Sequence, residues 1–154
     1  MIRFAKNTDI PQILELLKQV NKVHYDGRPD VFKLGTKYDQ KELEEILCQK
    51  DKPILVWTDE FDVVQGYCFC IVLEQEETRL LQGNKTLYID DLCVDENHRG
   101  KHIGKELFAS AEKLAKDLDC YNLTLNVWSC NPTAMKFYES LGLLPQKTYL
   151  EKIL

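Results

Sequence analysis

The stretch from Leu87 to Leu107, LYIDDLCVDENHRGKHIGKEL, changes from a strand pattern to a helix pattern within one turn. β-Branched and aromatic residues dominate its first part, up to Val94, as is typical of a buried strand. Apolar residues then recur at helical spacing, at Ile103, Leu107, Ala111, Leu114 and Leu118. A turn that opens a helix presents unpaired backbone N–H groups and the positive end of the helix dipole, so this turn predicts a phosphate site.

The side chains of the same turn are positively charged or titratable: Arg99, Lys101, His102 and Lys105. Such side chains favour a ligand with two or three phosphates over a neutral ligand. A tight connection with a solvated basic face explains the same residues, because strand-to-helix turns that contain glycine are common. The turn alone leaves both interpretations open.

Two ordered motifs resemble those of the GNAT family of N-acetyltransferases. The segment Arg99 to Gly104, RGKHIG, is similar to the acyl-coenzyme A signature of that family, with His102 in place of its first glycine. The segment Asn131 to Gly142, NPTAMKFYESLG, is similar to the later block, and Leu143 stands where the family most often has Phe. The acidic pair in YIDDLCV resembles the polyamine acetyltransferase branch.

The resemblance implies an α/β fold in which residues 1–154 form a single N-acetyltransferase domain. Its sheet is expected to be mixed, mostly antiparallel, splayed between its two central strands and flanked by helices. The implied reaction transfers acetyl from acetyl-coenzyme A (acetyl-CoA) to a primary amine of a small molecule or peptide, by direct attack in a ternary complex. The implied cofactor-binding residues are Leu92, Cys93, Val94, Arg99, Gly100, Lys101, His102, Ile103, Gly104, Lys105 and Asn131.

The resemblance also implies two catalytic residues, Tyr138 and Asp90. The Tyr138 phenol would protonate the departing thiolate of coenzyme A. Because an amine acceptor has a pKa near about 10, its proton must leave before attack, and Asp90 would take it. Adjacent strand residues point to opposite faces, so Asp90 is expected to share its face with Tyr88 and Leu92 and not to pair with Asp91. Asp91 or a chain of waters stays open as the alternative base.

The segment His24 to Lys37, HYDGRPDVFKLGTK, is irregular and rich in turn residues. In the family, this region lies over the acceptor, so Tyr25, Asp30 and Phe32 are candidate acceptor contacts. A loop pinned by its aromatic residues is the structural alternative.

Two further interpretations of function stay open. A non-catalytic module that senses acyl-CoA would need the same phosphate site in the turn but no catalytic acid or base. An acyl-enzyme on Cys93 would need an adjacent base in a known pattern, and none follows it, so a buried structural cysteine is favoured.

Composition limits the partners and the compartment. A net charge of −5 disfavours nucleic acid, and no apolar run approaches the ~20 residues of a membrane span. The first residues lack the apolar run of a signal peptide, so a cytoplasmic protein is expected. Six cysteines without a CxxC pair and three scattered histidines predict reduced thiols and no metal site. The expected partners are acetyl-CoA and an amine acceptor, and a homodimer stays open.

The other elements follow from periodicity and capping signals. Asp9 with Gln12 and Asp39 with Glu42 are spaced as helix-capping pairs, and the first helix is expected to end near residue 23. A bulge is expected at Gly66, and Gly142 is expected to end the last helix. The remaining expected elements are strands at Ile2–Ala5, Ile54–Thr58, Val63–Leu73, Leu123–Trp128 and Thr148–Leu154 and a helix at Pro132–Leu141.

Overall fold

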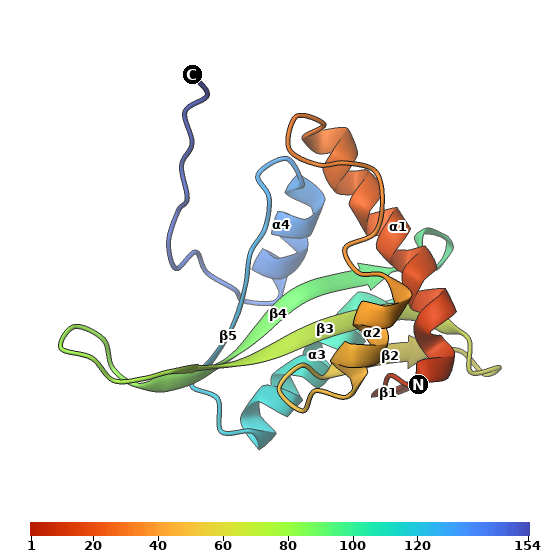
Figure 1. Ribbon diagram of the computed structural model, residues 1–154, viewed down its shortest axis with the longest axis horizontal. Coiled ribbons are helices and arrows are strands. Elements are labelled where there is room, and N and C mark those ends of the chain that lie inside the picture. Colours follow the sequence, from red (N-terminus) through yellow and green to blue (C-terminus); the bar gives the residue numbers. More distant parts are fainter.

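A computed structural model of the chain describes residues 1–154 and contains one five-stranded sheet in the order β1-β2-β3-β4-β5 (Figure 1). The first four strands are antiparallel neighbours, whereas β5 runs parallel to β4. The strands are β1 (Ile2–Phe4), β2 (Ile54–Thr58), β3 (Val64–Gln75), β4 (Asn84–Val94) and β5 (Asn122–Leu125). The helices are α1 (Ile10–Gly27), α2 (Gln40–Leu47), α3 (Ile103–Asp117) and α4 (Pro132–Ser140), with short 3-10 turns η1 (Asn7–Asp9) and η2 (Glu96–His98). The predicted mixed, mostly antiparallel α/β sheet is confirmed.

Different helices cover the two faces of the sheet, with α1 and α2 on one side and α3 on the other (Figure 1). Successive strand residues alternate between the faces, so neighbours such as Leu55 and Val56 belong to different cores. The core under α1 and α2 includes Ile13, Leu17, Leu43, Val56 and Tyr67. The core under α3 includes Leu55, Cys68, Leu87, Leu107 and Ala111. This division leaves β4 sandwiched between both helix layers.

The sheet opens between β4 and β5. The two strands pair only from Thr86 with Asn122 to Ile89 with Leu125, whereas β4 stays paired with β3 as far as Val94. The part of β4 beyond Ile89 therefore has one free edge, and α4 and the end of α1 lie on either side of the opening (Figure 1). The predicted split between the two central strands is confirmed.

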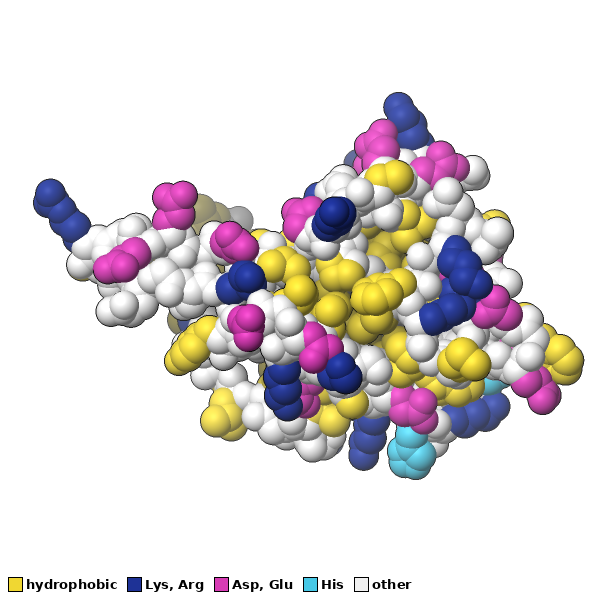
Figure 2. Space-filling view, turned by 90° about the horizontal axis from the view of Figure 1, so that it is seen from below, with side chains coloured by type: hydrophobic (Ala, Val, Ile, Leu, Met, Phe, Trp, Pro, Cys, Tyr) yellow, Lys and Arg dark blue, Asp and Glu magenta, His cyan; other side chains and the backbone are white.

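The hairpin that joins β3 and β4 projects from the body of the molecule, away from this opening (Figure 1). Figure 2 shows charged side chains on this projection, and a hollow of apolar side chains at the centre of the same face. The tip contains Glu76, Glu77 and the highly exposed Leu80. These acidic side chains are therefore part of a solvated connection.

The bulge between β2 and β3 lies one residue from its predicted position. Trp57 pairs with Gly66 and Thr58 pairs with Val64, so Gln65 is the extra residue. Gly66 is needed beside it, because a Cβ there would come within 2.9 Å of the Cys93 carbonyl oxygen. The glycine thus permits close approach of two backbones.

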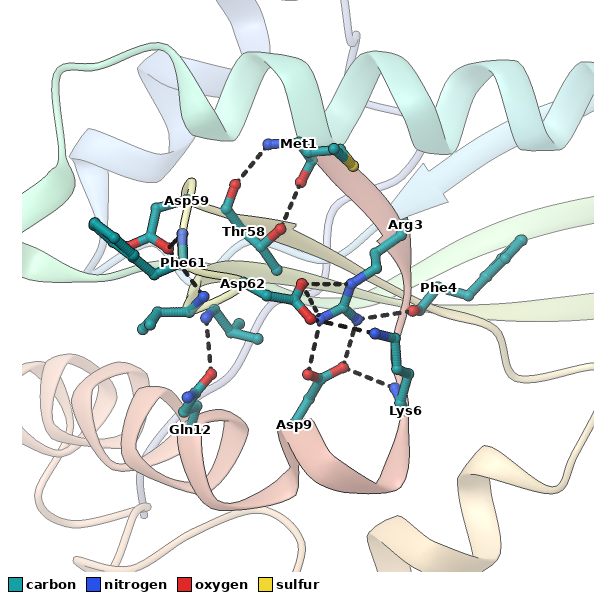
Figure 3. A network of polar contacts seen from close by, with 12 residues as sticks. Met1, Arg3, Phe4, Lys6, Asp9, Gln12, Thr58, Asp59, Phe61 and Asp62 are labelled. Carbon is teal, nitrogen blue, oxygen red and sulfur yellow. Dashed lines mark hydrogen bonds and ion pairs between the residues drawn. The ribbon is translucent and has the colours of Figure 1, made fainter.

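The start of α1 differs from the prediction. Asp9 makes no side-chain capping bond; its carboxylate pairs with the Arg3 guanidinium at 2.7 Å and accepts the Lys6 N–H at 2.8 Å (Figure 3). Gln12 does not cap either, because its side-chain oxygen accepts the Val64 N–H at 2.8 Å. The predicted Asp9–Gln12 capping pair is therefore wrong, because the ion pair with Arg3 takes the Asp9 carboxylate.

Other predicted ends are partly confirmed. Asp39 and Glu42 form the reciprocal capping box of α2, with both bonds at 2.8 Å. The first helix runs on to Gly27, so its predicted end near residue 23 and the irregular start at His24 are wrong. Gly142 has φ 88° directly after α4, as expected for a left-handed helix terminator.

The end of the chain does not join the sheet. Residues 143–154, here called the C-terminal arm, form no strand and run away from β5 (Figure 1). The predicted last strand at Thr148–Leu154 is therefore wrong, and the strand predicted at Leu123–Trp128 ends at Leu125. An alternating pattern indicates a strand only where an edge within reach can pair with it. None of the helices combines the length and the apolar character of a membrane span.

Candidate active site

A bulge in β4 breaks the alternation of side chains at the acidic pair. Phe69 of β3 pairs with Asp91, and the next residue, Cys70, pairs with Ile89. Asp90 is therefore the extra residue of β4 and has no partner in the ladder. An unpaired extra residue bends the strand and changes the direction of the side chains around it.

Both carboxylates consequently lie on the face covered by α1 and α2. The Tyr38 hydroxyl donates to Asp90 at 2.8 Å, and the Tyr67 hydroxyl donates to Asp91 at 2.9 Å. Both tyrosine rings pack on Phe69, with ring centroids 5.6 Å and 4.9 Å away. The prediction that the two aspartates point to opposite faces is wrong, because it assumed an unbroken strand.

Leu92 points the other way. Its side chain packs with the core under α3, on the face opposite Asp90. The expectation that Asp90 and Leu92 share a face is therefore wrong for the same reason, since the bulge shifts the alternation by one residue.

Asp90 is the more strongly paired carboxylate. Its Oδ1 lies 2.7 Å from Lys37 Nζ, and its side chain is 12% exposed. The same ammonium lies 5.6 Å from the centre of the Tyr38 ring, within the range of a cation–π contact. Burial and the bond to Asp90 raise the pKa of Tyr38, so this phenol is a neutral donor. Asp90 therefore already lies beside a primary ammonium.

Asp91 lies in a less polar setting. Burial raises the pKa of its carboxyl to about 6; the Tyr67 hydrogen bond and the charge of Lys37 oppose this shift, and the charge of Asp90 adds to it. Burial also holds the pKa of Tyr67 well above its usual value, so its phenol stays protonated and keeps donating. A carboxylate with a pKa near neutrality can both accept and release a proton under physiological conditions.

An aromatic row crosses the opening of the sheet. Phe32 stacks on His24 at 5.1 Å between centroids and meets Trp128 edge-on at 5.0 Å. Trp128 lies between β5 and α4, so this contact joins the loop after α1 to the far wall of the opening. Burial and the charge of Lys37 lower the pKa of His24, which favours the neutral ring that stacks. Phe32 therefore lies at the opening, and its contact with an acceptor stays a prediction.

The other two predicted acceptor contacts are placed differently. Tyr25 lies on the last turns of α1, half-buried, rather than in a loop. Asp30 forms a two-pronged ion pair with Arg28, at 2.9 Å and 2.8 Å, and Arg28 also contacts Glu151 of the C-terminal arm. The Asp30 carboxylate is therefore engaged within the chain and is not brought to the two aspartates of β4.

The turn before α3 has the geometry of an anion cradle. Gly100 and His102 both have left-handed backbones, with φ 80° and 64°. No backbone N–H from Arg99 to Lys105 donates to another group of the chain, and the first bond of the helix runs from Glu106 N–H to the His102 carbonyl. Free N–H groups at the start of a fifteen-residue helix can bind a phosphate or another anion.

The side chains of the cradle leave its backbone accessible. Arg99, Lys101, His102 and Lys105 are all exposed, and Arg99 Nε donates to the Val94 carbonyl at 3.3 Å. His102 makes no side-chain capping bond. Ile103 is instead a buried core residue of α3. Gly104 lets α3 pack closely on α4, because a Cβ there would lie 3.3 Å from the Phe137 ring.

Tyr138 of α4 lies against the core under α3. Its ring is half-buried, 6.4 Å from Phe108 and 5.1 Å from Phe137, and its hydroxyl makes no hydrogen bond within the chain. Burial, and then nearby negative charge including Asp91, raises the pKa of Tyr138, so the phenol keeps its proton at neutral pH. Asn131 caps α4, because its Oδ1 accepts the Ala134 N–H at 3.1 Å.

Cys93 has the setting of a structural residue. Its side chain is buried, and its thiol donates to the Leu16 carbonyl at 3.6 Å. Burial raises the pKa of the Cys93 thiol to about 12, so almost none is thiolate at neutral pH. This setting disfavours an acyl-enzyme on Cys93.

The sequence interpretation missed the residues that reach the site from distant segments: His24, Lys37, Tyr38, Tyr67 and Trp128. Only Tyr38 carries a signal that could have found it, since it directly precedes the Asp39 capping box and is therefore held at the start of a helix. Nothing local marks Lys37, because its partner Asp90 is 53 residues away in the chain.

Known proteins similar to this chain include acetyltransferases. The family model of the acetyltransferase (GNAT) family matches residues 17–143. The chain is 39% identical over 54 residues to a probable glucosamine 6-phosphate N-acetyltransferase of Drosophila melanogaster, covering 35% of this chain and 23% of that protein. It is 26% identical over 153 residues to the thialysine N-epsilon-acetyltransferase of Bos taurus, covering 92% of this chain and 82% of that protein.

A solved structure extends the similarity to the whole fold. The structure of a tetramutant of the BH1408 protein from Bacillus halodurans matches with a TM-score of 0.96 and 30% identity, over 100% of this chain and 99% of that one. By contrast, the match to the Drosophila melanogaster protein spans 23% of that protein's length. Since the family model covers most of the residues that build the opening and the cradle, the chain belongs to the acetyltransferase (GNAT) family.

Proposed function

We propose that this protein is an acetyl-CoA-dependent N-acetyltransferase whose acceptor is a primary amine of a small molecule or peptide, and that this amine reaches the site as a cation. One observation carries the proposal: the β4 bulge places Asp90 and Asp91 on one face, at the start of the free edge of β4 that runs on to Val94. The ammonium of Lys37, paired with Asp90 at 2.7 Å, supports the cationic acceptor, because it occupies the kind of setting that such an acceptor needs.

The cradle and the free edge of β4 would hold acetyl-CoA. Backbone N–H groups from Arg99 to Lys105 would donate to the pyrophosphate, and Arg99, Lys101 and Lys105 would add charge. The main chain of Leu92, Cys93 and Val94 would pair with the pantetheine arm as an added strand pairs with an open edge. Asn131, which already caps α4, has a free amide nitrogen that can contact the same ligand. When bound, acetyl-CoA supplies the activated acetyl group.

The two aspartates would divide the work of preparing the acceptor. Asp90 would bind the acceptor ammonium in place of Lys37, because it is the carboxylate that already holds an ammonium. Asp91 would accept the proton that the ammonium must lose, directly or through a water, because its pKa of about 6 lies closer to neutrality. Adjacent carboxylates on one face titrate as a coupled pair, so the pH profile would report apparent pKa values of the pair and not of either aspartate alone.

Tyr138 would return a proton to the leaving thiolate of coenzyme A. Its raised pKa keeps the phenol protonated, and its hydroxyl has no competing partner within the chain. The ring is half-buried, and α4, which carries it, flanks the opening (Figure 1). The acid and the base thus come from different elements, α4 and β4.

A screen of amines would test this function. Thiol release from acetyl-CoA would be followed with diamines and polyamines, amino acids, amino sugars and peptide N-termini as acceptors. Acceptor-dependent release that is strongest with cationic primary amines is the expected result. Binding of acetyl-CoA without thiol release for any amine class would instead favour the non-catalytic sensor of acyl-CoA.

We also propose that a second copy of the chain covers the C-terminal arm. Four of its apolar side chains are almost fully exposed: Leu144 at 87%, Tyr149 at 98%, Leu150 at 84% and Ile153 at 77%. The outer edge of β5 has no strand neighbour. In a two-fold dimer, the exposed apolar arm of each copy can pack against the open β5 edge of the other copy.

Sedimentation at several protein concentrations would test the dimer. The parent is expected to be dimeric, and the double variant Leu150→Asp, Ile153→Asp is expected to be monomeric. Leu80→Asp, at an equally exposed site on the hairpin tip, is the matched control and should leave the dimer intact. A monomeric parent at all concentrations would contradict this proposal. We also propose a cytoplasmic location, which is supported by six cysteines that form no disulfide with one another.

A further inference from the structure

Lys37 places a primary amine of the chain itself inside the candidate active site. Its Nζ lies 2.7 Å from Asp90 Oδ1, 3.4 Å from the Asp90 carbonyl oxygen and 5.6 Å from the centre of the Tyr38 ring. It is the only lysine whose ammonium contacts either aspartate of the β4 bulge. A carboxylate, a carbonyl and an aromatic face are the groups that recognise a primary ammonium.

We propose that Lys37 is a site of self-acetylation, at which its own Nζ takes the place of the acceptor amine; this inference rests on the proposed function. The Lys37 side chain is 44% exposed, so its flexible four-carbon stem is not locked by packing. Its partner Asp90 is the first residue of the free edge of β4, two residues and roughly 7 Å along the strand before Leu92, where the proposed pairing with the pantetheine arm starts. A small swing of the stem along this edge brings the amine toward the end of the pantetheine arm.

The step balances without any further reactant. The Lys37 ammonium first gives one proton to the aspartate pair, which passes it to solvent. The neutral Nζ then forms a bond to the acetyl carbonyl carbon, and the bond from that carbon to the sulfur of coenzyme A breaks. The second Nζ proton leaves the new amide nitrogen, and Tyr138 or solvent gives a proton to the thiolate. The net products are Nε-acetyl-lysine, coenzyme A with a free thiol, and one proton.

Acetylation would change the electrostatics of the site. The amide that forms carries no charge, so Asp90 would lose its ion pair with Lys37. The charge of Lys37 also lowers the pKa of Asp91, and this effect would disappear. Self-acetylation would therefore alter both carboxylates at once.

Two neighbouring lysines serve as internal controls. Lys33 lies in the same loop and is exposed, and it contacts neither aspartate. Lys41 lies on α2, where its side chain is 83% exposed and 4.0 Å from Glu45. Acetyl-CoA also acetylates exposed lysines without catalysis, so any rate at Lys33 or Lys41 measures that background.

The experiment incubates the intact protein with isotope-labelled acetyl-CoA and no acceptor, and follows label at each lysine by peptide mass spectrometry. We expect label at Lys37 at least tenfold faster than at Lys33 or Lys41, at a rate independent of protein concentration because the reaction is intramolecular. Arg99→Ala should slow labelling of Lys37 alone, since it weakens binding of the acetyl donor. Lys41→Arg should leave labelling of Lys37 unchanged.

Equal labelling of Lys37 and the control lysines, or no labelling of Lys37, would overturn the inference. If the amine screen still shows acceptor-dependent thiol release in that case, the proposed function stands and only the role of Lys37 is wrong. If neither label nor thiol release occurs and calorimetry shows no binding of acetyl-CoA, both proposals fail. Folding of each variant would be checked by its thermal transition.

Discussion

Lys37 Nζ lies 2.7 Å from Asp90 Oδ1, so the loop before α2 is tied to the bulge of β4 across 53 residues of sequence. Under the proposed function, a cationic acceptor would have to displace this ammonium to reach Asp90. The contact therefore couples the loop before α2 to the carboxylates that would prepare the acceptor.

Replacing Lys37 by Met should strengthen acceptor binding. The variant removes a competing ammonium, and a half-exposed ion pair is worth about 0.2–1 kcal/mol, so KM for a cationic amine should fall up to about fivefold. The acidic limb of the pH profile should also move upward, because the charge of Lys37 lowers the pKa of Asp91. Steady-state kinetics from pH 5 to 9 would measure both effects, with Lys41→Met as control. A raised KM would contradict competition by Lys37.

Asp91→Asn should lower activity and stabilise the fold. In the folded chain the pKa of Asp91 is raised from 3.8 to about 6, so between these pH values the folded chain keeps a proton that the unfolded chain has released. The free energy of unfolding of the parent therefore falls as pH rises through this window. The Asn side chain does not titrate, so the variant does not lose this stability. We expect it to be more stable than the parent by up to about 3 kcal/mol at pH 7, with no difference below about pH 3.5.

The activity of the same variant separates the two aspartates. Asp91→Asn should reduce kcat/KM by about 10²-fold and remove the limb near the pKa of about 6, because the proton acceptor is lost. Asp90→Asn should instead raise KM for cationic acceptors and keep that limb. Urea titrations and pH profiles would check both variants. If the acidic limb of the pH profile were unchanged in Asp91→Asn, then Asp90 or a water would be the base instead of Asp91.

Arg99→Ala should weaken binding of coenzyme A by about 1–3 kcal/mol, through loss of a charge-assisted contact to phosphate. His102→Gly is the matched control in the same turn. Its left-handed backbone, φ 64°, suits glycine, and its side chain is exposed, so affinity should stay within tenfold, or about 1.4 kcal/mol, of the parent. Calorimetry would measure both. Equal affinities of parent and Arg99→Ala would remove Arg99 from the cradle.

Tyr138→Phe should reduce turnover while cofactor affinity stays close to that of the parent. The change removes the phenolic proton and keeps the packing of the ring on Phe108 and Phe137. General acid catalysis contributes about 10²–10⁴-fold, so a loss of that size is expected where chemistry limits the rate. A turnover number equal to that of the parent under those conditions would leave Tyr138 with a packing role alone.

Arg3→Met should destabilise the fold by about 2–4 kcal/mol, because it strips a buried carboxylate of its partner. Burial alone would raise the pKa of Asp9, yet Arg3 and the Lys6 N–H hold it below its usual value, so this stabilisation is present above about pH 4 and lost as pH falls. Lys6→Met removes only the exposed pair with Asp62 and should cost less than about 0.5 kcal/mol. Equal effects of the two variants on urea unfolding would contradict the special role of Arg3 (Figure 3).

Short sequence patterns correctly predicted the features that depend only on residues close together in the chain. The change from strand to helix between Val94 and Ile103, the Asp39 capping box and the Gly142 terminator all depend on residues within a few positions of one another. The same holds for the cradle, whose N–H groups are left free simply because a helix begins there. These features could be predicted from the sequence.

The pairing of distant segments decided the rest. One unpaired residue in the ladder between β3 and β4 places Asp90 and Asp91 on one face, and no local pattern marks which residue a ladder will skip. Lys37 meets Asp90 because the packing of the loop before α2 brings together two residues that are 53 positions apart. Asp9 pairs with Arg3 of β1 instead of capping α1. The sequence by itself determined the strand-to-helix turn before α3, the cap of α2, the terminator of α4 and the family. Only the tertiary structure decided which charges share a face, since that depends on register and packing across the sheet.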